Sequence, residues 1–234
     1  MKIDDPVAVR RQYATEANLE ARRSLYRRAE GPDPRELTFA AVAEAAPRSV
    51  LEVGGGPGEL AERIATELAC QVVMVDVSER MVELARGRAV EAQVGDVQAL
   101  PFEDACFDCA VAAWMLFHVP DLDRGLAELA RVLRPRGRLV AVTNAHEHLH
   151  ELRAIAGAAA WESTFTRENG AEILERHFGA VDRRDADGWV TIDDHEQVRD
   201  YLDSLLAEAE IEPQPYELPL RIRRASSVFV AEKA

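Results

Sequence analysis

The chain has 234 residues, of which 42 are acidic and 28 are basic, so its formal net charge is -14. This length suits one α/β domain with an appended cap. The excess of acid repels phosphate backbones, so a nucleic-acid partner is not expected. No apolar run approaches the roughly 20 residues of a membrane span, and Asp4 and Asp5 stand where a signal peptide needs apolar residues. We therefore expect a cytoplasmic protein without a membrane partner.

The first 50 residues have a helical pattern. Apolar side chains recur at helical spacing over residues 6–28, with Tyr13 on the apolar face and arginines on the other. Residues 31–34 (Gly-Pro-Asp-Pro) predict a turn, and residues 35–46 predict the helix that leads into the first strand.

Residues 49–59 read Ser-Val-Leu-Glu-Val-Gly-Gly-Gly-Pro-Gly-Glu and are the most informative stretch of the chain. A short apolar run ends in four glycines within five residues, and a helical pattern begins at Leu60. Glycine has no β-carbon, so this turn can adopt positive φ angles and bring its backbone against a ligand, in front of the free N–H groups of the helix. The pattern predicts a strand, a tight turn and a helix that bind a nucleotide-like cofactor.

The glycine spacing helps to choose between cofactors. A dinucleotide site needs a third glycine three residues after Gly56, but that place holds Glu59, whose charge would oppose a pyrophosphate. A nucleoside with an uncharged tail fits better. A second apolar run, residues 72–75, ends in Asp76, about 20 residues on, where a carboxylate can accept both hydroxyls of a ribose. The alternative role for Asp76 is to cap the end of its strand.

Strand and helix patterns alternate after Asp76. Ser78 is a plausible N-cap for a helix over residues 79–88. The following patterns predict strands at 92–94, 105–112 and 138–143, a helix at 123–133 that stops before Pro135, helices at 147–160, 166–178 and 193–209, a long strand at 180–192 interrupted at Gly188, and a last strand at 225–231. The alternation is typical of a doubly wound, mainly parallel α/β sheet, whose ligands lie outside the carboxyl ends of the strands.

Five stretches between Ser49 and Thr143 together resemble the class I S-adenosylmethionine-dependent methyltransferases, in particular the ubiquinone/menaquinone C-methyltransferase-like group (methyltransferase type 11). In order, they are Glu52–Gly58, Val75–Met81, Gly95–Phe102, Phe107–Val119 and Leu129–Val140.

The resemblance implies a Rossmann-like, seven-stranded sheet with an antiparallel edge and helical lid elements, and S-adenosyl-L-methionine as the cofactor. It implies an N-terminal lid helix in residues 1–34, a cofactor-binding core in 35–143, and a C-terminal half with cap helices and the last two strands in 144–234. The residues that it places at the cofactor are Glu52, Gly54, Gly55, Gly56, Gly58, Asp76, Val77, Met81, Asp96, Val97 and Ala113.

The acceptor side departs from the family pattern. Ala113 and Trp114 replace a small polar and an acidic residue, and Phe117 replaces a histidine, which makes this side apolar. We expect Trp114 and Phe117 to contact the acceptor. Tyr13 either joins them, as the family's leading helix implies, or packs its helix on the core.

Two histidines are candidates to orient or deprotonate an acceptor, because a histidine titrates near neutral pH. His118 is the first and His146 the second; the alternatives are a histidine that holds backbone and a solvated lid helix. His146 and His150 could share one helix face beside Glu147, but no third ligand is evident, so no metal is expected.

The function expected is transfer of a methyl group to a small organic molecule by in-line displacement, which depends on alignment and exclusion of water. The alternatives are an RNA or protein methyltransferase, and an NAD-dependent oxidoreductase or a non-catalytic nucleotide-binding protein. A monomer and a homodimer are equally compatible with the sequence.

Overall fold

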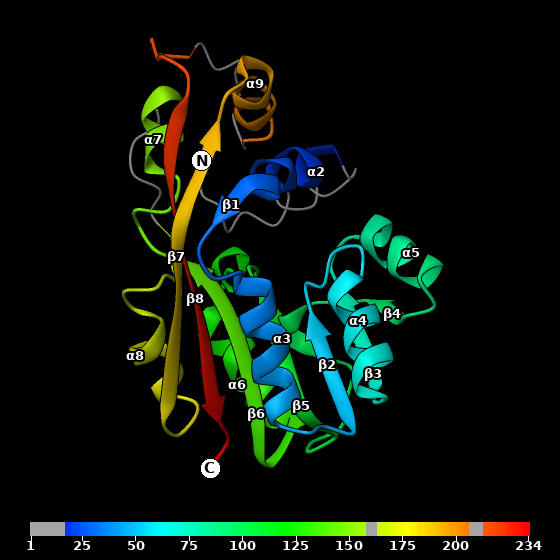
Figure 1. The fold of residues 1–234 in the computed structure, drawn as a ribbon. Helices are drawn as coiled ribbons and strands as arrows, with labels where there is room; N and C mark the ends of the chain where they lie inside the picture. The colour runs from blue at the N-terminus through cyan, green and yellow to red at the C-terminus, as the bar shows by residue number, and fades with distance from the viewer. Residues whose placement is uncertain (1–16, 158–162, 206–212) are drawn as a thin grey trace.

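The computed structural model describes residues 17–157, 163–205 and 213–234 (Figure 1). The leading helix is described from α2 (Ala17–Ser24), which continues into the 3-10 helix η1 (Leu25–Arg28). Tyr13 lies outside the described residues, as do the ends of the helices expected at 147–160 and 193–209. Within the described ranges, no helix is long and apolar enough to cross a lipid bilayer.

One mixed sheet runs through the described chain in the strand order β1-β7-β8-β6-β5-β2-β3-β4. The strands are β1 (Ala29–Glu30), β2 (Ser49–Val53), β3 (Gln71–Asp76), β4 (Glu91–Val94), β5 (Phe107–Ala113), β6 (Leu133–Asn144), β7 (Val181–Ile192) and β8 (Leu220–Glu232). Strands β2 to β6 are parallel, and β7 and β8 form the antiparallel edge. The predicted fold class is confirmed.

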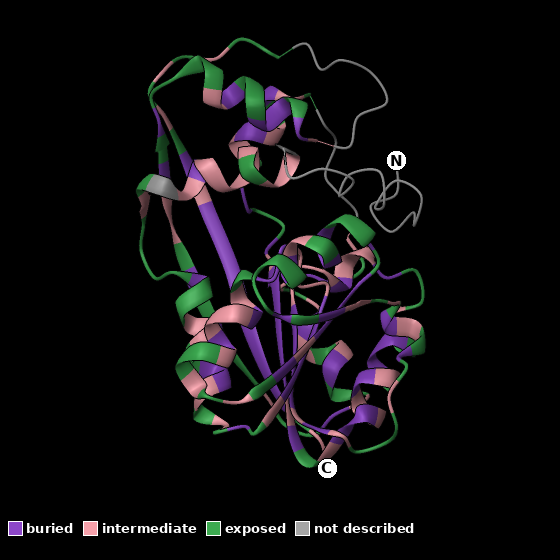
Figure 2. Ribbon diagram, turned by 90° about the vertical axis from the view of Figure 1, so that its right-hand side faces the viewer, coloured by how far each residue is buried: buried purple, intermediate pink, exposed green. Residues whose placement is uncertain are grey.

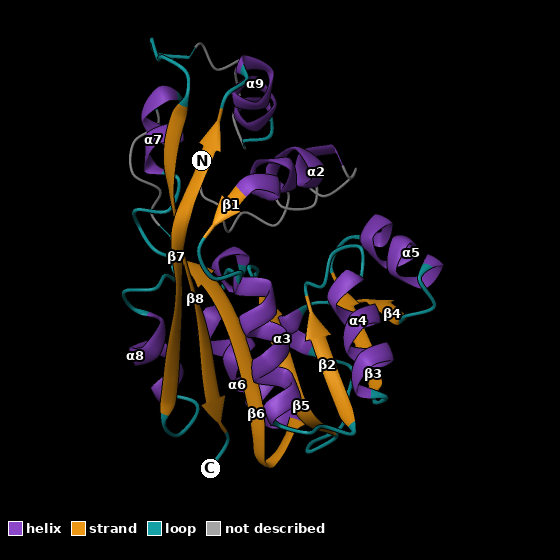
Figure 3. Ribbon diagram, viewed as in Figure 1, coloured by secondary structure: helices purple, strands orange, loops and turns teal. Residues whose placement is uncertain are grey.

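Helices cover both faces of this sheet, as Figure 3 shows. The covering helices are α3 (Pro34–Glu44), α4 (Glu59–Leu68) and α5 (Glu79–Gly87) on one face, and α6 (Leu122–Val132) and α8 (Gly170–Glu175) on the other. Side chains alternate accordingly: in β5, Cys109 and Val111 pack toward α3 and α4, whereas Ala110 and Ala112 pack toward α6. Both faces are buried, as expected for parallel strands.

A smaller cap lies beyond the carboxyl ends of the parallel strands. Strand β6 pairs with β8 only from Asn144 opposite Ser226, whereas β7 and β8 remain paired as far as Ile192 opposite Leu220. This two-stranded extension carries α7 (His150–Ile155) and α9 (His195–Asp203), which pack with η1 in a separate apolar cluster. Figure 2 shows buried residues (purple) in the helices of this upper part as well as in the strands below.

The loop after β6 covers the edge of β8 that β6 leaves free. The N–H of Ala145 donates to the carbonyl of Ala225 (2.9 Å), and the N–H of Leu149 donates to the carbonyl of Arg223 (2.8 Å). The N–H of Ala225 donates to Nδ1 of His148 (3.0 Å). Side-chain and backbone groups of this loop thereby replace a neighbouring strand, because buried backbone groups need partners.

Two expectations about the sheet were wrong. An eighth strand, β1, pairs with β7 at Val190 and Trp189, in addition to the seven expected. The interruption predicted at Gly188 is absent, since β7 is continuous through its pairing with Arg224. A β-carbon at Gly188 would lie 1.8 Å from the carbonyl oxygen of Glu30. Glycine is required there because β1 approaches the β7 backbone closely, which is a long-range contact.

Other differences concern the ends of elements. Strand β6 begins at Leu133, five residues before the expected start at Arg138, and β8 begins at Leu220 rather than Ala225. Helix α7 begins only at His150, so His146 lies in the preceding turn and does not share a helix face with His150. The Ser78 N-cap is confirmed: its hydroxyl accepts the N–H of Met81 at 3.3 Å.

Candidate functional site

A cavity of about 870 Å³ lies at the carboxyl ends of the parallel strands and is lined by both the sheet and the cap. This volume is near the upper end of the roughly 300–1,000 Å³ typical of small-molecule sites. Most of the expected cofactor residues line it, namely Glu52, Gly54, Gly55, Gly56, Asp76, Val77, Asp96, Val97 and Ala113. Trp114, Phe117, His118 and His146 line it as well.

Gly58 and Met81 are the two expected cofactor residues that do not line the cavity. Gly58 is the N-cap of α4, where a β-carbon would meet Ala85 at 2.7 Å. Met81 is fully buried in α5. Both residues pack behind the residues that line the cavity.

The glycine turn is held between the end of β3 and the loop after β5. Gly54 has φ +63°, its N–H donates to the carbonyl of Val75 (2.7 Å), and a β-carbon on it would lie 2.7 Å from the side chain of Met115. Gly55 leaves room for Glu52, because a β-carbon there would lie 2.8 Å from the Glu52 carboxyl carbon. The close packing of this turn therefore requires glycine.

Asp76 lies at the end of β3 and is 8% exposed. One carboxylate oxygen accepts the N–H of Gly56 (3.0 Å) and the other accepts the N–H of Ser78 (2.9 Å). Burial raises the pKa of this carboxyl, and these backbone N–H groups oppose the rise. Asp76 thus braces the glycine turn, and a carboxylate with about four acceptor positions retains capacity for further donors.

Glu52 precedes the glycine turn and is 2% exposed. Burial raises the pKa of its carboxyl to about 8, a rise opposed by a hydrogen bond from the Ala61 backbone and increased by the charge of Asp76. Its Oε2 atom is buried and has no hydrogen-bond partner among the described residues. A buried carboxylate oxygen without a partner is costly, so this atom fits a ligand that brings a donor or a positive charge.

The expected acceptor residues come from the loop after β5. Trp114 has φ +55°, and its indole N–H donates to Oδ1 of Asn144 (3.1 Å), which also accepts the hydroxyl of Ser226 (2.8 Å). The rings of Phe117 and His118 are 4.5 Å apart in the next turn, η3 (Leu116–His118). These contacts fix a mainly apolar wall beside one imidazole.

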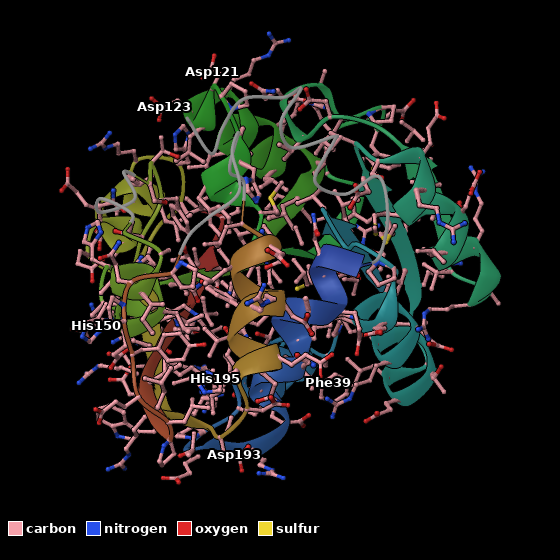
Figure 4. The ribbon with its side chains drawn as sticks, turned by 90° about the horizontal axis from the view of Figure 1, so that it is seen from above. Phe39, Asp121, Asp123, His150, Asp193 and His195 are labelled. Atoms are coloured by element: carbon pink, nitrogen blue, oxygen red, sulfur yellow. The ribbon has the colours of Figure 1, made fainter. Side chains whose placement is uncertain are left out.

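His146 is more exposed than His118, and its Nε2 lies 3.6 Å from a carboxylate oxygen of Glu168. His150 lies on α7 at the edge of the molecule (Figure 4) and does not line the cavity. In the described ranges no group of three His, Cys, Asp or Glu side chains is arranged to hold a metal ion.

The sequence interpretation missed several residues that line the cap end of the cavity: Tyr26, His148, Arg153, Tyr201 and Arg224. The hydroxyl of Tyr26 lies 3.0 Å from Nε2 of His148, although the two residues are 122 positions apart. Within residues 146–150, only His146 was predicted as a candidate site residue, with a solvated lid helix as the alternative. No local pattern marks His148 as buried, because its burial depends on β8.

Residues 51–141 match the family model described as "Methyltransferase domain". The chain is 36% identical over 104 residues to the ubiquinone/menaquinone biosynthesis C-methyltransferase UbiE of Hahella chejuensis, covering 40% of this chain and 42% of that protein. It is 41% identical over 98 residues to the 27-O-demethylrifamycin SV methyltransferase of Amycolatopsis mediterranei, covering 38% of this chain and 36% of that protein. The matched segment therefore spans less than half the length of either relative.

The fold is similar to that of solved methyltransferase structures over nearly the whole chain. A SAM-dependent methyltransferase from Thermotoga maritima matches with a TM-score of 0.62 and 22% identity, covering 96% of this chain and 99% of that one. This likeness concerns the fold and includes the cap as well as the core.

Proposed function

We propose, from the premise that residues 51–141 form a class I S-adenosylmethionine-dependent methyltransferase domain, that the protein transfers a methyl group from S-adenosyl-L-methionine to a small organic molecule. The observation that carries the proposal is the unpartnered, buried Glu52 oxygen beside the glycine turn. That atom suits the ammonium group of the cofactor's amino-acid tail. When bound, the cofactor supplies an electrophilic methyl group on a sulfonium.

Each part of the cavity has a separate task in this proposal. Asp76 accepts the ribose hydroxyls while it braces Gly56, and Asp96, Val77 and Val97 hold the base side. Trp114 and Phe117 orient the acceptor and keep water away, so that nucleophile and methyl group remain aligned. His118 is the first candidate to take a proton from a hydroxyl or amine acceptor, and His146 the second.

In the same proposal, different segments of the chain bind the acceptor and the cofactor. The N-terminal segment and the cap elements after residue 144 close over the acceptor, and residues 35–143 hold the cofactor. A small acceptor is favoured over RNA because the chain carries a net charge of -14 and repels phosphate backbones.

Calorimetric titration tests the cofactor assignment. We expect micromolar affinity for S-adenosylhomocysteine and much weaker binding of NAD. Asp76→Ala removes two charge-assisted hydrogen bonds, worth roughly 1.5–3 kcal/mol each, and should weaken binding at least tenfold. Asp182→Ala, which removes an exposed carboxylate outside the cavity, serves as the control. Tighter binding of NAD than of S-adenosylhomocysteine would contradict the proposal, and a mass increase of one methyl group in an acceptor screen would establish the activity.

A further inference from the structure

Arg224 is a buried cation at the cap end of the cavity, and no carboxylate among the described residues pairs with it. It is 4% exposed, and its Nη2 donates to the carbonyl oxygens of Glu30 (3.1 Å) and Pro32 (2.7 Å). Its Nε is buried and has no hydrogen-bond partner within the described ranges. A buried guanidinium held only by carbonyl groups is costly unless a further acceptor arrives.

Besides Glu52 and Asp76, four carboxylates among the described residues line the cavity, and all four are engaged. Asp96 accepts the backbone N–H and the side-chain amide of Gln98. Glu36 and Glu59 form ion pairs with Arg63 and Arg23, and Asp33 accepts the backbone N–H of Arg35 as the N-cap of α3. The chain has 42 acidic and 28 basic residues, yet no described carboxylate pairs with Arg224, which lines the cavity. This indicates that a ligand supplies the negative charge.

The hydrogen bonds of His148 determine which way the neighbouring Tyr26 hydroxyl points. The N–H of Ala225 donates to Nδ1 of His148 (3.0 Å), so Nδ1 carries no proton and the neutral ring is protonated at Nε2. That Nε2–H donates to the Tyr26 oxygen, 3.0 Å away. The hydroxyl proton of Tyr26 is therefore directed away from His148 and is available to an acceptor in the cavity.

The direction of the hydrogen bond from His148 to Tyr26 does not change at ordinary pH. Burial and the charge of Arg153 lower the pKa of His148 to about 3, so the ring remains neutral. Burial raises the pKa of the Tyr26 hydroxyl, so Tyr26 keeps its proton. The pair consequently offers a hydrogen-bond donor and not a base.

We propose that the Tyr26 hydroxyl and the Arg224 guanidinium form a subsite for a carboxylate on the methyl acceptor, with His148 as the positioning residue that keeps Tyr26 a donor. The inference rests on the proposed function, because it assumes that the cofactor occupies the Glu52 and Asp76 end. The subsite is carried by η1, the loop after β6 and the β8 extension, which belong to the cap. An uncharged donor and a guanidinium together match the oxygens of a carboxylate.

The test compares carboxylates with their uncharged amides. Calorimetry on protein saturated with S-adenosylhomocysteine measures the binding of three pairs of compounds: acetate and acetamide, benzoate and benzamide, and octanoate and octanamide. We expect at least one carboxylate to bind about tenfold more tightly than its amide, as one charge-assisted hydrogen bond provides. Tyr26→Phe should reduce the affinity for that carboxylate about fivefold or more, and Arg224→Gln should remove the preference.

Tyr216→Phe is the matched control. The Tyr216 hydroxyl lies 2.9 Å from Nδ1 of His195, a second tyrosine–histidine pair on the cap (His195 is labelled in Figure 4) that does not line the cavity. Its loss should change carboxylate affinity less than twofold. Circular dichroism identifies any Arg224→Gln protein that fails to fold, in which case Tyr26→Phe still decides.

Three results would overturn the assignment. The first is that no carboxylate in the series binds more tightly than its amide, and the second is that Tyr26→Phe changes carboxylate affinity no more than Tyr216→Phe. The third is that Tyr26→Phe weakens the binding of S-adenosylhomocysteine but not that of 5′-methylthioadenosine, which lacks the amino-acid tail; the subsite then holds the cofactor's own carboxylate. Failure of S-adenosylhomocysteine to bind at all contradicts the proposed function instead, and the carboxylate series is then measured on the free protein.

The role of His148 has its own readout. Nitrogen-15 NMR should show a neutral ring protonated at Nε2 that does not titrate between pH 5 and 8. Protonation at Nδ1, or titration in this range, would show that His148 does not fix Tyr26 as a donor.

Discussion

Glu52 is a buried acid whose ionised form its surroundings do not compensate. Its folded pKa of about 8 lies above the ordinary value of 4.5, so between these two pH values the folded protein holds a proton that the unfolded chain releases. Stability therefore falls as pH rises through this window. The buried Asp76, whose pKa is also raised, contributes in the same direction.

Glu52→Gln should remove much of this dependence, because glutamine has the shape of the protonated acid and cannot ionise. We expect the variant to be more stable than the wild type at pH 8, by on the order of 4 kcal/mol, and to differ little from it at pH 5. Urea unfolding at the two pH values measures the difference, with the exposed Glu103→Gln as the control. If the free energy of unfolding changes equally with pH in the wild type and in Glu52→Gln, Glu52 ionises in the folded protein without loss of stability.

At the scale of elements, the contact between β1 and β7 joins the N-terminal segment to the cap. It depends on Gly188, because any β-carbon there would collide with the carbonyl of Glu30. Arg224 pairs with Gly188 in the adjacent strand and bonds the same carbonyl. The position of η1, and with it Tyr26, is therefore coupled to one glycine.

Gly188→Ala should displace β1 and lower stability by about 1–3 kcal/mol, the usual cost of overpacking. Gly87→Ala is the matched control: it lies at the end of α5, a β-carbon there meets nothing within 4 Å, and alanine favours helix. Thermal unfolding compares the two variants. A Gly188→Ala protein as stable as the control would show that β1 adjusts without loss.

At the scale of the whole molecule, the described residues form three buried apolar clusters. Two lie on opposite faces of the sheet beneath its covering helices, and a smaller one lies in the cap on the β7–β8 extension. Because the cap has fewer buried contacts, it should open at lower free energy than the sheet. Such opening provides a route for ligands into the cavity.

Hydrogen exchange measured with and without S-adenosylhomocysteine tests this difference. We expect residues 17–30 and 144–157 to exchange readily in the free protein and to become protected with ligand, while β2, β5 and β6 stay protected throughout. Asp76→Ala at the same ligand concentration is the control. Equally slow exchange of the cap in both states would contradict a lid that opens.

Local sequence pattern was sufficient for the core of the molecule. The strand, glycine turn and helix at 49–68, the acid at the end of β3 and the Ser78 cap were all predicted, because each depends on residues close together in the chain. The alternation of strand and helix patterns that predicted the sheet is also a local feature of the sequence.

The cap end of the cavity was not predictable from local sequence pattern. Tyr26 meets His148 across 122 positions, and Arg224 meets Glu30 across 194. Burial, tautomer and charge compensation there depend on strand register and on the β7–β8 extension, which only tertiary packing determines.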